Sequence, residues 1–138
     1  MTDRPLPVPD NETSPFWGGT RAGEIRLRCC ADCNYAMFYP RLICPECGSD
    51  NLIWKAARGH GTIYSVTVVH RAPAAFRDLV PYAVAMIELE EGPRMMSRLL
   101  TNTPDDVAIG DKVQVHFENQ NDEISLPHFK LEKDANTK

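Results

Sequence analysis

Four of the five cysteines form two closely spaced pairs, and this spacing carries the clearest chemistry in the 138-residue sequence. Cys30 and Cys33 make one C-x2-C pair, and Cys44 and Cys47 make a second pair after a spacer of ten residues. Two such knuckles supply the four soft ligands that tetrahedral zinc prefers. Iron is the alternative, because four thiolates suit both metals. The spacing predicts one metal ion that is fully enclosed by protein ligands and therefore structural, not catalytic.

Cys29, the fifth cysteine, directly precedes Cys30 and could replace it at C-x3-C spacing. The symmetric arrangement favours Cys30, so we expect Cys29 to be packed or surface-exposed. Free thiols and a disulfide are the alternatives to a metal, and two such pairs in a reducing compartment disfavour both. We expect a cytoplasmic protein without membrane association. Residues 1–9 lack the apolar core of a secretory signal, and no apolar run is long enough to span a bilayer.

Other residues that could do chemistry are few. Among four histidines, His70 alone opens a long loop, and it is the one histidine that we would test for function. Arg71 and Arg77 in the same loop could grip a phosphate such as that of coenzyme A, although exposed loop arginines are often only solvated. The sequence shows no Ser-His-Asp grouping, nucleophile elbow, phosphate loop or dinucleotide fingerprint. It therefore does not indicate an enzyme acting by itself. The remaining histidines are His60, His116 and His128, for which we expect surface or strand positions.

The elements that position these residues are short. We expect a helix over 15–22, which Thr13 or Ser14 would cap with a hydroxyl and Pro15 would open. Strands are expected over 25–28 and 52–54 on either side of the cysteine pairs, with 38–40 as an extended arm between them. Alternating and β-branched residues then predict five further strands, separated by a turn at Gly59-His60-Gly61, a loop at 70–81 and a polar connection at 102–111. These strands are expected over 62–69, 82–89, 94–100, 112–118 and 124–131.

Five short strands without helical periodicity must curl to bury one face, which favours a small barrel, with a five-stranded OB-fold as the leading candidate. The predicted fold is thus mainly β. The predicted organisation is an N-terminal tail and short helix (1–22), a zinc ribbon (23–58) and an OB-fold domain with a short tail (59–138). The net charge is −4, with the acidic excess in the barrel part. A nucleic-acid-binding surface usually needs a dense basic face, so the charge argues against that function.

The order of motifs along the chain resembles the DUF35 family. The resemblance covers about residues 14–131 and rests on both C-x2-C knuckles and on their flanking motifs. One departure is Asn34, where members often have Gly; Asn also tolerates the left-handed conformation that a knuckle needs. The flanking motifs are Pro15-Phe16-Trp17, Gly23-Glu24-Ile25, Pro40-Arg41, Cys47-Gly48-Ser49 and Gly59-x-Gly61-Thr62-Ile63-Tyr64-Ser65.

The resemblance implies an N-terminal helix, a rubredoxin-like zinc ribbon and an OB-fold. It also implies a non-catalytic subunit that binds a thiolase-like enzyme and supports its acyl-CoA chemistry, which forms or cleaves C–C bonds. Coenzyme A is then expected at or near the shared interface. The alternatives are a single-strand nucleic-acid-binding module, since ribbons and OB-folds both serve that role, and a stand-alone acyl-CoA-binding protein. Aromatic residues expected as interface anchors or as the ribbon's own small core are Phe16, Trp17, Tyr35, Phe38 and Tyr39.

Overall fold

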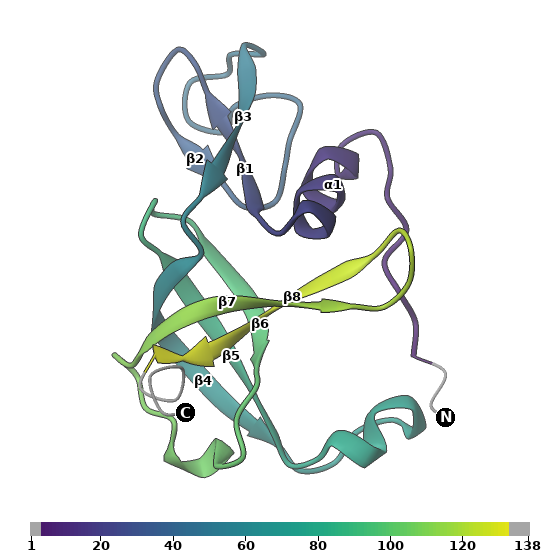
Figure 1. The fold of residues 1–138 in the computed structure, drawn as a ribbon. Coiled ribbons are helices and arrows are strands. Elements are labelled where there is room, and N and C mark those ends of the chain that lie inside the picture. Colours follow the sequence, from purple (N-terminus) through teal and green to yellow (C-terminus); the bar gives the residue numbers. More distant parts are fainter. Residues whose placement is uncertain (1–3, 133–138) are drawn as a thin grey trace.

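The fold consists of a small three-stranded sheet and a helix set on one end of a β-barrel (Figure 1). A computed structural model describes residues 4–132. Among these residues, no helix is long and apolar enough to cross a membrane. The ribbon part contains α1 (Ser14–Ala22), β1 (Ile25–Cys30), β2 (Ala36–Met37) and β3 (Leu52–Ala57). The barrel contains β4 (His60–Val69), β5 (Tyr82–Leu89), β6 (Arg94–Leu99), β7 (Lys112–Asn119) and β8 (Ser125–Leu131), with 3-10 helices η1 (Ala74–Leu79) and η2 (Pro104–Asp106).

Helix α1 begins and ends at local signals in the sequence. Pro15 lies in its first turn, and Gly23 ends it in the left-handed conformation with φ 89°. The expected hydroxyl cap is wrong, because neither Thr13 nor Ser14 bonds a helix N–H through its side chain. Instead, the Asp10 carboxylate accepts bonds from the N–H groups of Glu12 and Thr13, both at 2.9 Å. These bonds lower the pKa of Asp10 and order the chain one turn before the helix.

The ribbon sheet has the strand order β2-β1-β3, and both pairs are antiparallel. Strand β1 alternates as its sequence predicts: Ile25 and Leu27 are buried, while Arg26 and Arg28 are half-buried. The Arg28 guanidinium lies 5.0 Å from the ring centroid of Trp54 on the neighbouring strand β3. The sheet therefore has one apolar face, which it turns toward α1 and the barrel.

The five barrel strands close in the order β4-β5-β6-β8-β7, which confirms the predicted five-stranded barrel. Strand β7 returns to pair with the start of β4, and this pairing closes the barrel. All pairs are antiparallel except β6 with β8, which meet in parallel at Leu99 and Phe129. Strand β4 bends through an irregularity between Ile63 and Ser65, which suits the long opening strand of a small barrel.

One hydrophobic core connects the barrel with the ribbon sheet. Phe129 and Ile87 are fully buried inside the barrel, and the same cluster extends to Phe16 of α1 and to Ile25 and Leu27 of β1. Phe16 also packs edge-to-face on Phe38, with ring centroids 5.5 Å apart. The helix thus fills the space between the two sheets, and the ribbon is part of the protein's main core.

Some boundaries differ from those expected. His60 and Gly61 belong to β4, so the predicted Gly-His-Gly turn shrinks to Gly59, whose φ is 81°. Gly61 is required there by packing: a Cβ would come within 2.7 Å of the Glu88 carbonyl oxygen and of the Ile87 side chain. The 70–81 loop and the 102–111 connection contain η1 and η2. The extended arm expected at 38–40 is wrong, because β2 ends at residue 37.

Candidate metal centre

Two knuckles of nearly identical backbone geometry carry the four paired cysteines. The N–H of Asn34 donates to the Cys30 carbonyl and the N–H of Gly48 donates to the Cys44 carbonyl, each at 2.9 Å. Asn34 (φ 67°) and Gly48 (φ 76°) both adopt the left-handed conformation, which Gly and Asn tolerate best. Each knuckle is therefore a turn that ends on a residue suited to positive φ, and it directs both of its thiols to one side.

The four thiols converge on one point. The loops that carry them form the end of the ribbon remote from the barrel (Figure 1). The Sγ atoms of Cys30 and Cys47 are 3.5 Å apart and those of Cys33 and Cys44 are 3.6 Å apart, and all four lie within 4.8 Å of one another. A tetrahedral ion with bonds of about 2.3 Å separates its sulfur ligands by about 3.8 Å. The donor set and spacing therefore fit one tetrahedral metal ion.

Backbone N–H groups around the cluster favour thiolates. Burial opposes ionisation of Cys30, but N–H groups of Cys33 and Asp32 lower the pKa of its thiol to about 7. At Cys33, the Tyr35 N–H favours the thiolate, yet burial and the neighbouring sulfurs raise its pKa to about 12. Four thiols so close cannot all ionise without a compensating cation. A divalent metal supplies that charge, so the electrostatics and the geometry point to the same group.

Polar bonds outside the cluster hold the first knuckle against the start of β3. The Asp32 carboxylate accepts bonds from the Ser49 hydroxyl and from the Asn51 side-chain amide, the latter at 3.1 Å. These bonds lower the pKa of Asp32, the Ser49 bond being the larger cause. The Ala31 N–H also donates to the Asn51 carbonyl at 2.9 Å. The second knuckle and the strand after it are thereby fixed relative to the first.

Cys29 lies outside the four-thiol group. Its side chain is 7% exposed and belongs to the apolar core, and its Sγ is 3.8 Å from the Leu27 carbonyl oxygen. Burial raises the pKa of this thiol, whereas hydrogen bonds lower the pKa of the neighbouring Cys30 thiol overall. Cys29 is thus packed, which was one of the two positions expected for it.

Two family profiles match consecutive parts of the chain: "ChsH2, rubredoxin-like zinc ribbon domain" over residues 17–52 and "ChsH2, C-terminal OB-fold domain" over residues 54–118. A "DUF35 domain-containing scaffold protein" of Methanothermobacter thermautotrophicus is 38% identical over 89 residues, which are 64% of this chain and 67% of that protein. The chain belongs to the DUF35 family. The four clustered cysteines are therefore those of a rubredoxin-like zinc ribbon.

Two further relatives connect this DUF35 chain to larger assemblies. The "3-oxo-4,17-pregnadiene-20-carboxyl-CoA hydratase alpha subunit" of Mycobacterium tuberculosis is 34% identical over 128 residues. Those residues are 91% of this chain but 38% of that protein, so the chain spans well under half of it. In the solved structure "Ltp2-ChsH2(DUF35) aldolase", one chain matches with a TM-score of 0.82 and 30% identity, covering 92% of this chain and 99% of that one.

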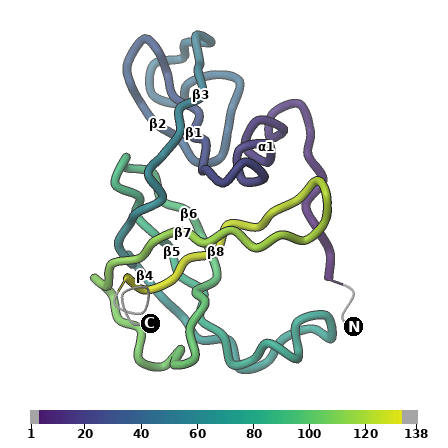
Figure 2. The backbone as a smooth tube through the Cα atoms, viewed as in Figure 1, coloured from purple at the N-terminus to yellow at the C-terminus, as the bar shows by residue number. Residues whose placement is uncertain are grey.

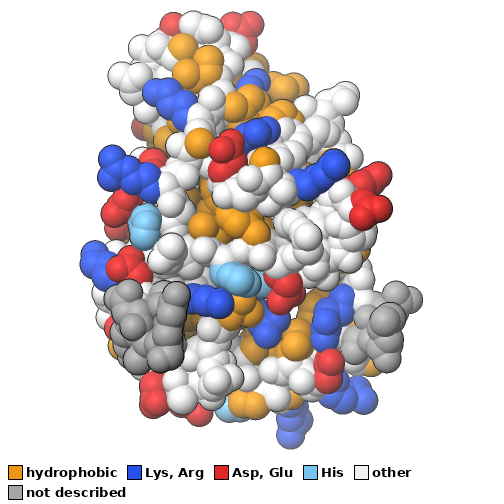
Figure 3. All heavy atoms as spheres, in the orientation of Figure 1, with side chains coloured by type: hydrophobic (Ala, Val, Ile, Leu, Met, Phe, Trp, Pro, Cys, Tyr) orange, Lys and Arg blue, Asp and Glu red, His pale blue; other side chains and the backbone are white. Residues whose placement is uncertain are grey.

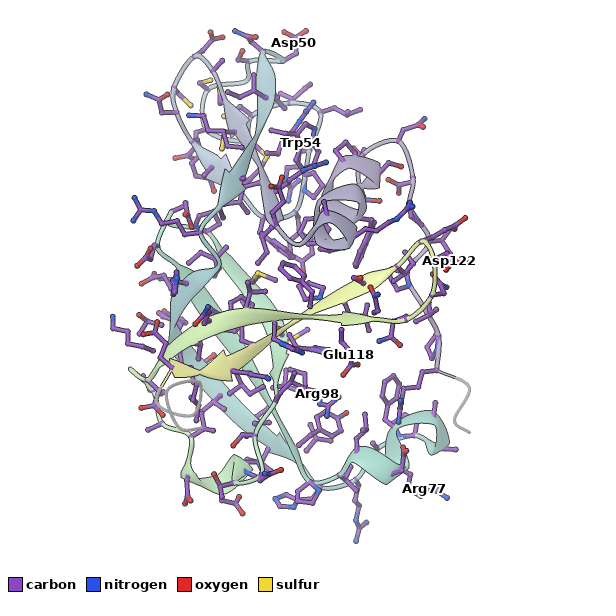
Figure 4. All side chains as sticks on the ribbon, in the orientation of Figure 1. Asp50, Trp54, Arg77, Arg98, Glu118 and Asp122 are labelled. Carbon is purple, nitrogen blue, oxygen red and sulfur yellow. The ribbon has the colours of Figure 1, made fainter. Side chains whose placement is uncertain are left out.

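The other predicted site residues lie away from the four thiols. His70 and Arg71 are exposed at the end of β4, and Arg77 is exposed on η1, where its side chain points away from the barrel (Figure 4). η1 lies at the end of the molecule opposite the ribbon (Figure 1). The coenzyme A contact expected for both arginines therefore stays a prediction and concerns a surface distinct from the metal centre.

The aromatic residues expected as anchors divide into two groups. Phe16 is buried at 5% exposure and Trp17 and Phe38 are half-buried, so these three belong to the core that joins ribbon and barrel. Tyr35 and Tyr39 are exposed, the latter at 66%. The spacer between the knuckles adds two exposed aliphatic side chains that the sequence pattern did not mark as anchors, namely Leu42 and Ile43. Figure 3 shows hydrophobic surface at this end of the molecule.

Proposed function

We propose that this DUF35 chain is a zinc-containing, non-catalytic subunit that docks on a thiolase-like enzyme and supports its acyl-CoA chemistry. The observation that carries the proposal is the convergence of four thiols on one point, with no position left for water or substrate. The similarity to a chain of an aldolase complex, over 99% of that chain, supports a role within an assembly. The named hydratase subunit supports the connection to acyl-CoA substrates.

In this proposal Cys30, Cys33, Cys44 and Cys47 hold one zinc ion. Bound zinc neutralises the four thiolates and fixes the two knuckles, and it takes no part in the reaction. Protein groups do the rest: N–H donors orient the sulfurs, and Asp32 ties the knuckles to β3. Iron is the chemical alternative, and elemental analysis of the purified chain separates the two metals.

The docking surface in this proposal is the spacer between the knuckles. Tyr39, Leu42 and Ile43 are 66%, 62% and 57% exposed, and they lie within five residues of the buried ligand Cys44. Large apolar side chains grouped at the surface mark interaction sites, and aromatic residues often dominate their binding energy. Because the metal fixes the spacer, loss of the metal should also remove the docking surface.

The test is co-purification with a thiolase-like subunit encoded beside this chain. Leu42→Asp and Ile43→Asp place a charge on the proposed surface and should weaken the complex at least tenfold. Val8→Asp is the matched control, because Val8 is an apolar residue with 85% exposure outside the spacer. Equal affinity of all three variants would contradict this surface, and recovery of a lone monomer from native cells would contradict the subunit role.

The contribution of Arg71 and Arg77 to coenzyme A binding is a finer part of the proposal. Calorimetry of the complex with acyl-CoA should show weaker binding for Arg71→Ala and Arg77→Ala if their guanidinium groups contact phosphate. Unchanged affinity would leave both residues as solvated loop side chains. Turnover of an acyl-CoA by the chain alone, or salt-sensitive binding of single-stranded nucleic acid, would favour the two alternative functions. On the face drawn in Figure 3, acidic and basic side chains alternate and do not form one basic stripe.

A further inference from the structure

A partly covered cavity of about 170 Å³ lies on the outer face of the barrel, far from the metal centre. Strands β5, β6, β7 and β8 form its floor, and η1 forms one wall. The N-terminal segment 4–6 covers it beside η1, and the chain then runs past the tip of the β7–β8 hairpin toward α1 (Figure 2). Its polar lining comes from Tyr82, Arg98, Glu118, Gln120 and His128.

The covering segment is held by specific bonds. The Arg4 guanidinium donates to the Ala75 carbonyl at 2.9 Å and to both carboxylate oxygens of Asp78, at 2.8 and 3.0 Å. It also lies 6.0 Å from the ring centroid of Phe76. The charge of Arg4 is therefore neutralised by Asp78 on η1. Because Arg4 is anchored there, the apolar residues Pro5 and Leu6 lie over the cavity.

An open apolar groove of about 340 Å³ adjoins the cavity. It runs between α1 and the barrel, with Phe16, Trp17 and Phe38 on one side and Val84 and Met96 on the other. Arg98, Leu126 and His128 line both hollows, so the groove leads to the polar end of the cavity. Together the two hollows reach the size of small-molecule sites, which is about 300–1,000 Å³.

Two buried polar atoms at the junction have no hydrogen-bond partner within residues 4–132. They are Nε of Arg98 and Nδ1 of His128. The Arg98 guanidinium lies 5.9 Å from the ring centroid of Tyr82, and among the described residues it forms no ion pair with a carboxylate. A buried guanidinium nitrogen without an acceptor is costly, because no protein group replaces its lost solvation.

Glu118 and His128 are the other titratable side chains at the junction. His128 Nε2 lies 3.5 Å from Glu118 Oε1, and that oxygen also accepts a bond of 3.1 Å from the Gln120 side-chain amide. Burial is the main cause that lowers the pKa of His128, and the Arg98 charge lowers it further. Figure 4 shows Arg98 and Glu118 in the same region below the β7–β8 hairpin. Because His128 is uncharged at neutral pH and Arg4 pairs with Asp78, Arg98 is the cation without a carboxylate partner among the described residues that line the cavity.

We propose that this cavity and groove bind a monocarboxylate with a short apolar chain, its carboxylate on Arg98 and His128 and its chain along the groove. A single negative charge matches the single unpaired guanidinium, and a carboxylate can accept two parallel bonds from it. A dianionic phosphate would require a second free cation. The apolar groove favours an anion with an apolar chain over small inorganic anions, because burial of the chain removes it from water.

The probe is sodium hexanoate, titrated into the metal-loaded, ¹⁵N-labelled full chain and followed by backbone amide shifts. Saturable shifts are expected at residues 97–99 and 126–129. Hexan-1-ol, which has the same chain length and no charge, should bind at least tenfold more weakly. Arg98→Gln should weaken hexanoate binding at least tenfold. The affinity of Arg98→Lys should lie between those of the unaltered chain and Arg98→Gln, because lysine keeps the charge but lacks the planar guanidinium.

Arg94→Gln is the matched control, because Arg94 lies on the same strand and face but pairs with Glu88 at 3.2 Å and does not line the cavity. Its hexanoate affinity should equal that of the unaltered chain. A second variant, His128→Asn, covers the case in which Arg98→Gln fails to fold. Absence of saturable shifts, or equal binding of hexanoate by all variants, would overturn the proposal. A third outcome would also overturn it: hexanoate leaves the spectrum unchanged, and Arg98→Gln no longer captures the protein partner. That result would assign the cavity to a carboxylate side chain of the partner.

Discussion

Removal of the metal should unfold the ribbon's end and leave the barrel intact. Between residues 31 and 51, the buried side chains are those of Met37 and Cys44. Burying a methionine contributes about 1.5–3 kcal/mol, whereas ordering backbone costs about 1–2 kcal/mol for each residue. A structural zinc ion contributes about 10–16 kcal/mol in small zinc modules. The ion is therefore the largest stabilising contribution for this segment.

The base of the ribbon should behave differently from its end. Ile25 and Leu27 are 0% and 1% exposed, and they pack in the same core as Phe129 of the barrel. This packing does not depend on the ion. Strand β1 and the barrel strands should therefore keep their structure after chelation, while the chain from 31 to 51 loses it.

Hydrogen–deuterium exchange before and after treatment with a metal chelator measures this difference directly. Peptides within 31–51 should exchange at the rate of an unfolded chain once the metal is gone, and peptides from β5 and β7 should stay protected. Cys30→Ser should mimic the chelator, whereas Cys29→Ser should retain one metal per chain because Cys29 lies outside the cluster. Persistent protection of 31–51 without metal, or metal loss in Cys29→Ser, would refute the reasoning.

Three further predictions concern stability. Gly61→Ala should lower the free energy of unfolding by about 1–3 kcal/mol in urea, since its Cβ would meet the Glu88 carbonyl. Gly18→Ala should raise it by about 0.5–1 kcal/mol, because Gly18 lies on an exposed helix face where a Cβ makes only an ordinary contact of 3.6 Å with the Arg26 side chain. Phe129→Ala should lower it by about 3–5 kcal/mol, and a loss under 1 kcal/mol would contradict the core assignment. Burial lowers the pKa of His128 below 6.5, so its imidazole binds a proton more readily in the unfolded chain than in the folded one. The free energy of unfolding should therefore be unaffected by His128 above about pH 6.5 and should fall as the pH decreases below that value. His128→Asn should flatten that decline in urea titrations at several pH values.

Local patterns account for what the sequence predicted well. Alternation places the barrel strands within one or two residues, as at Tyr82–Leu89, because a half-buried strand has a period of two. The two knuckles follow from cysteine spacing together with Asn34 and Gly48, because positive φ is a property of single residues. These features need no knowledge of what packs against them.

Other features depend on contacts between distant segments, so the sequence alone could not reveal them. Gly61 is a strand residue because β5 approaches it closely, and Phe16 is buried because α1 fills the space between two sheets. Arg98 and His128 lie thirty residues apart and meet because β6 and β8 are neighbours in the barrel. The bond from the Ser97 hydroxyl to the Pro127 carbonyl at 2.8 Å marks the same pairing. In the sequence, His70 stands out because it lies in a long loop, whereas nothing singles out His128, a strand residue that lines the cavity.

The connection between the ribbon and the barrel has a mechanical consequence. Strand β3 ends at Ala57 and β4 begins at His60, while α1 contacts β1, β7 and β8. Because this connection is short and α1 packs against both parts, the ribbon should not bend relative to the barrel. The knuckles and η1 lie at opposite ends of the molecule (Figure 1). Proteins held at these two ends would be kept at a constant separation. Inserting a few glycines at Arg58 would turn this connection between ribbon and barrel into a hinge.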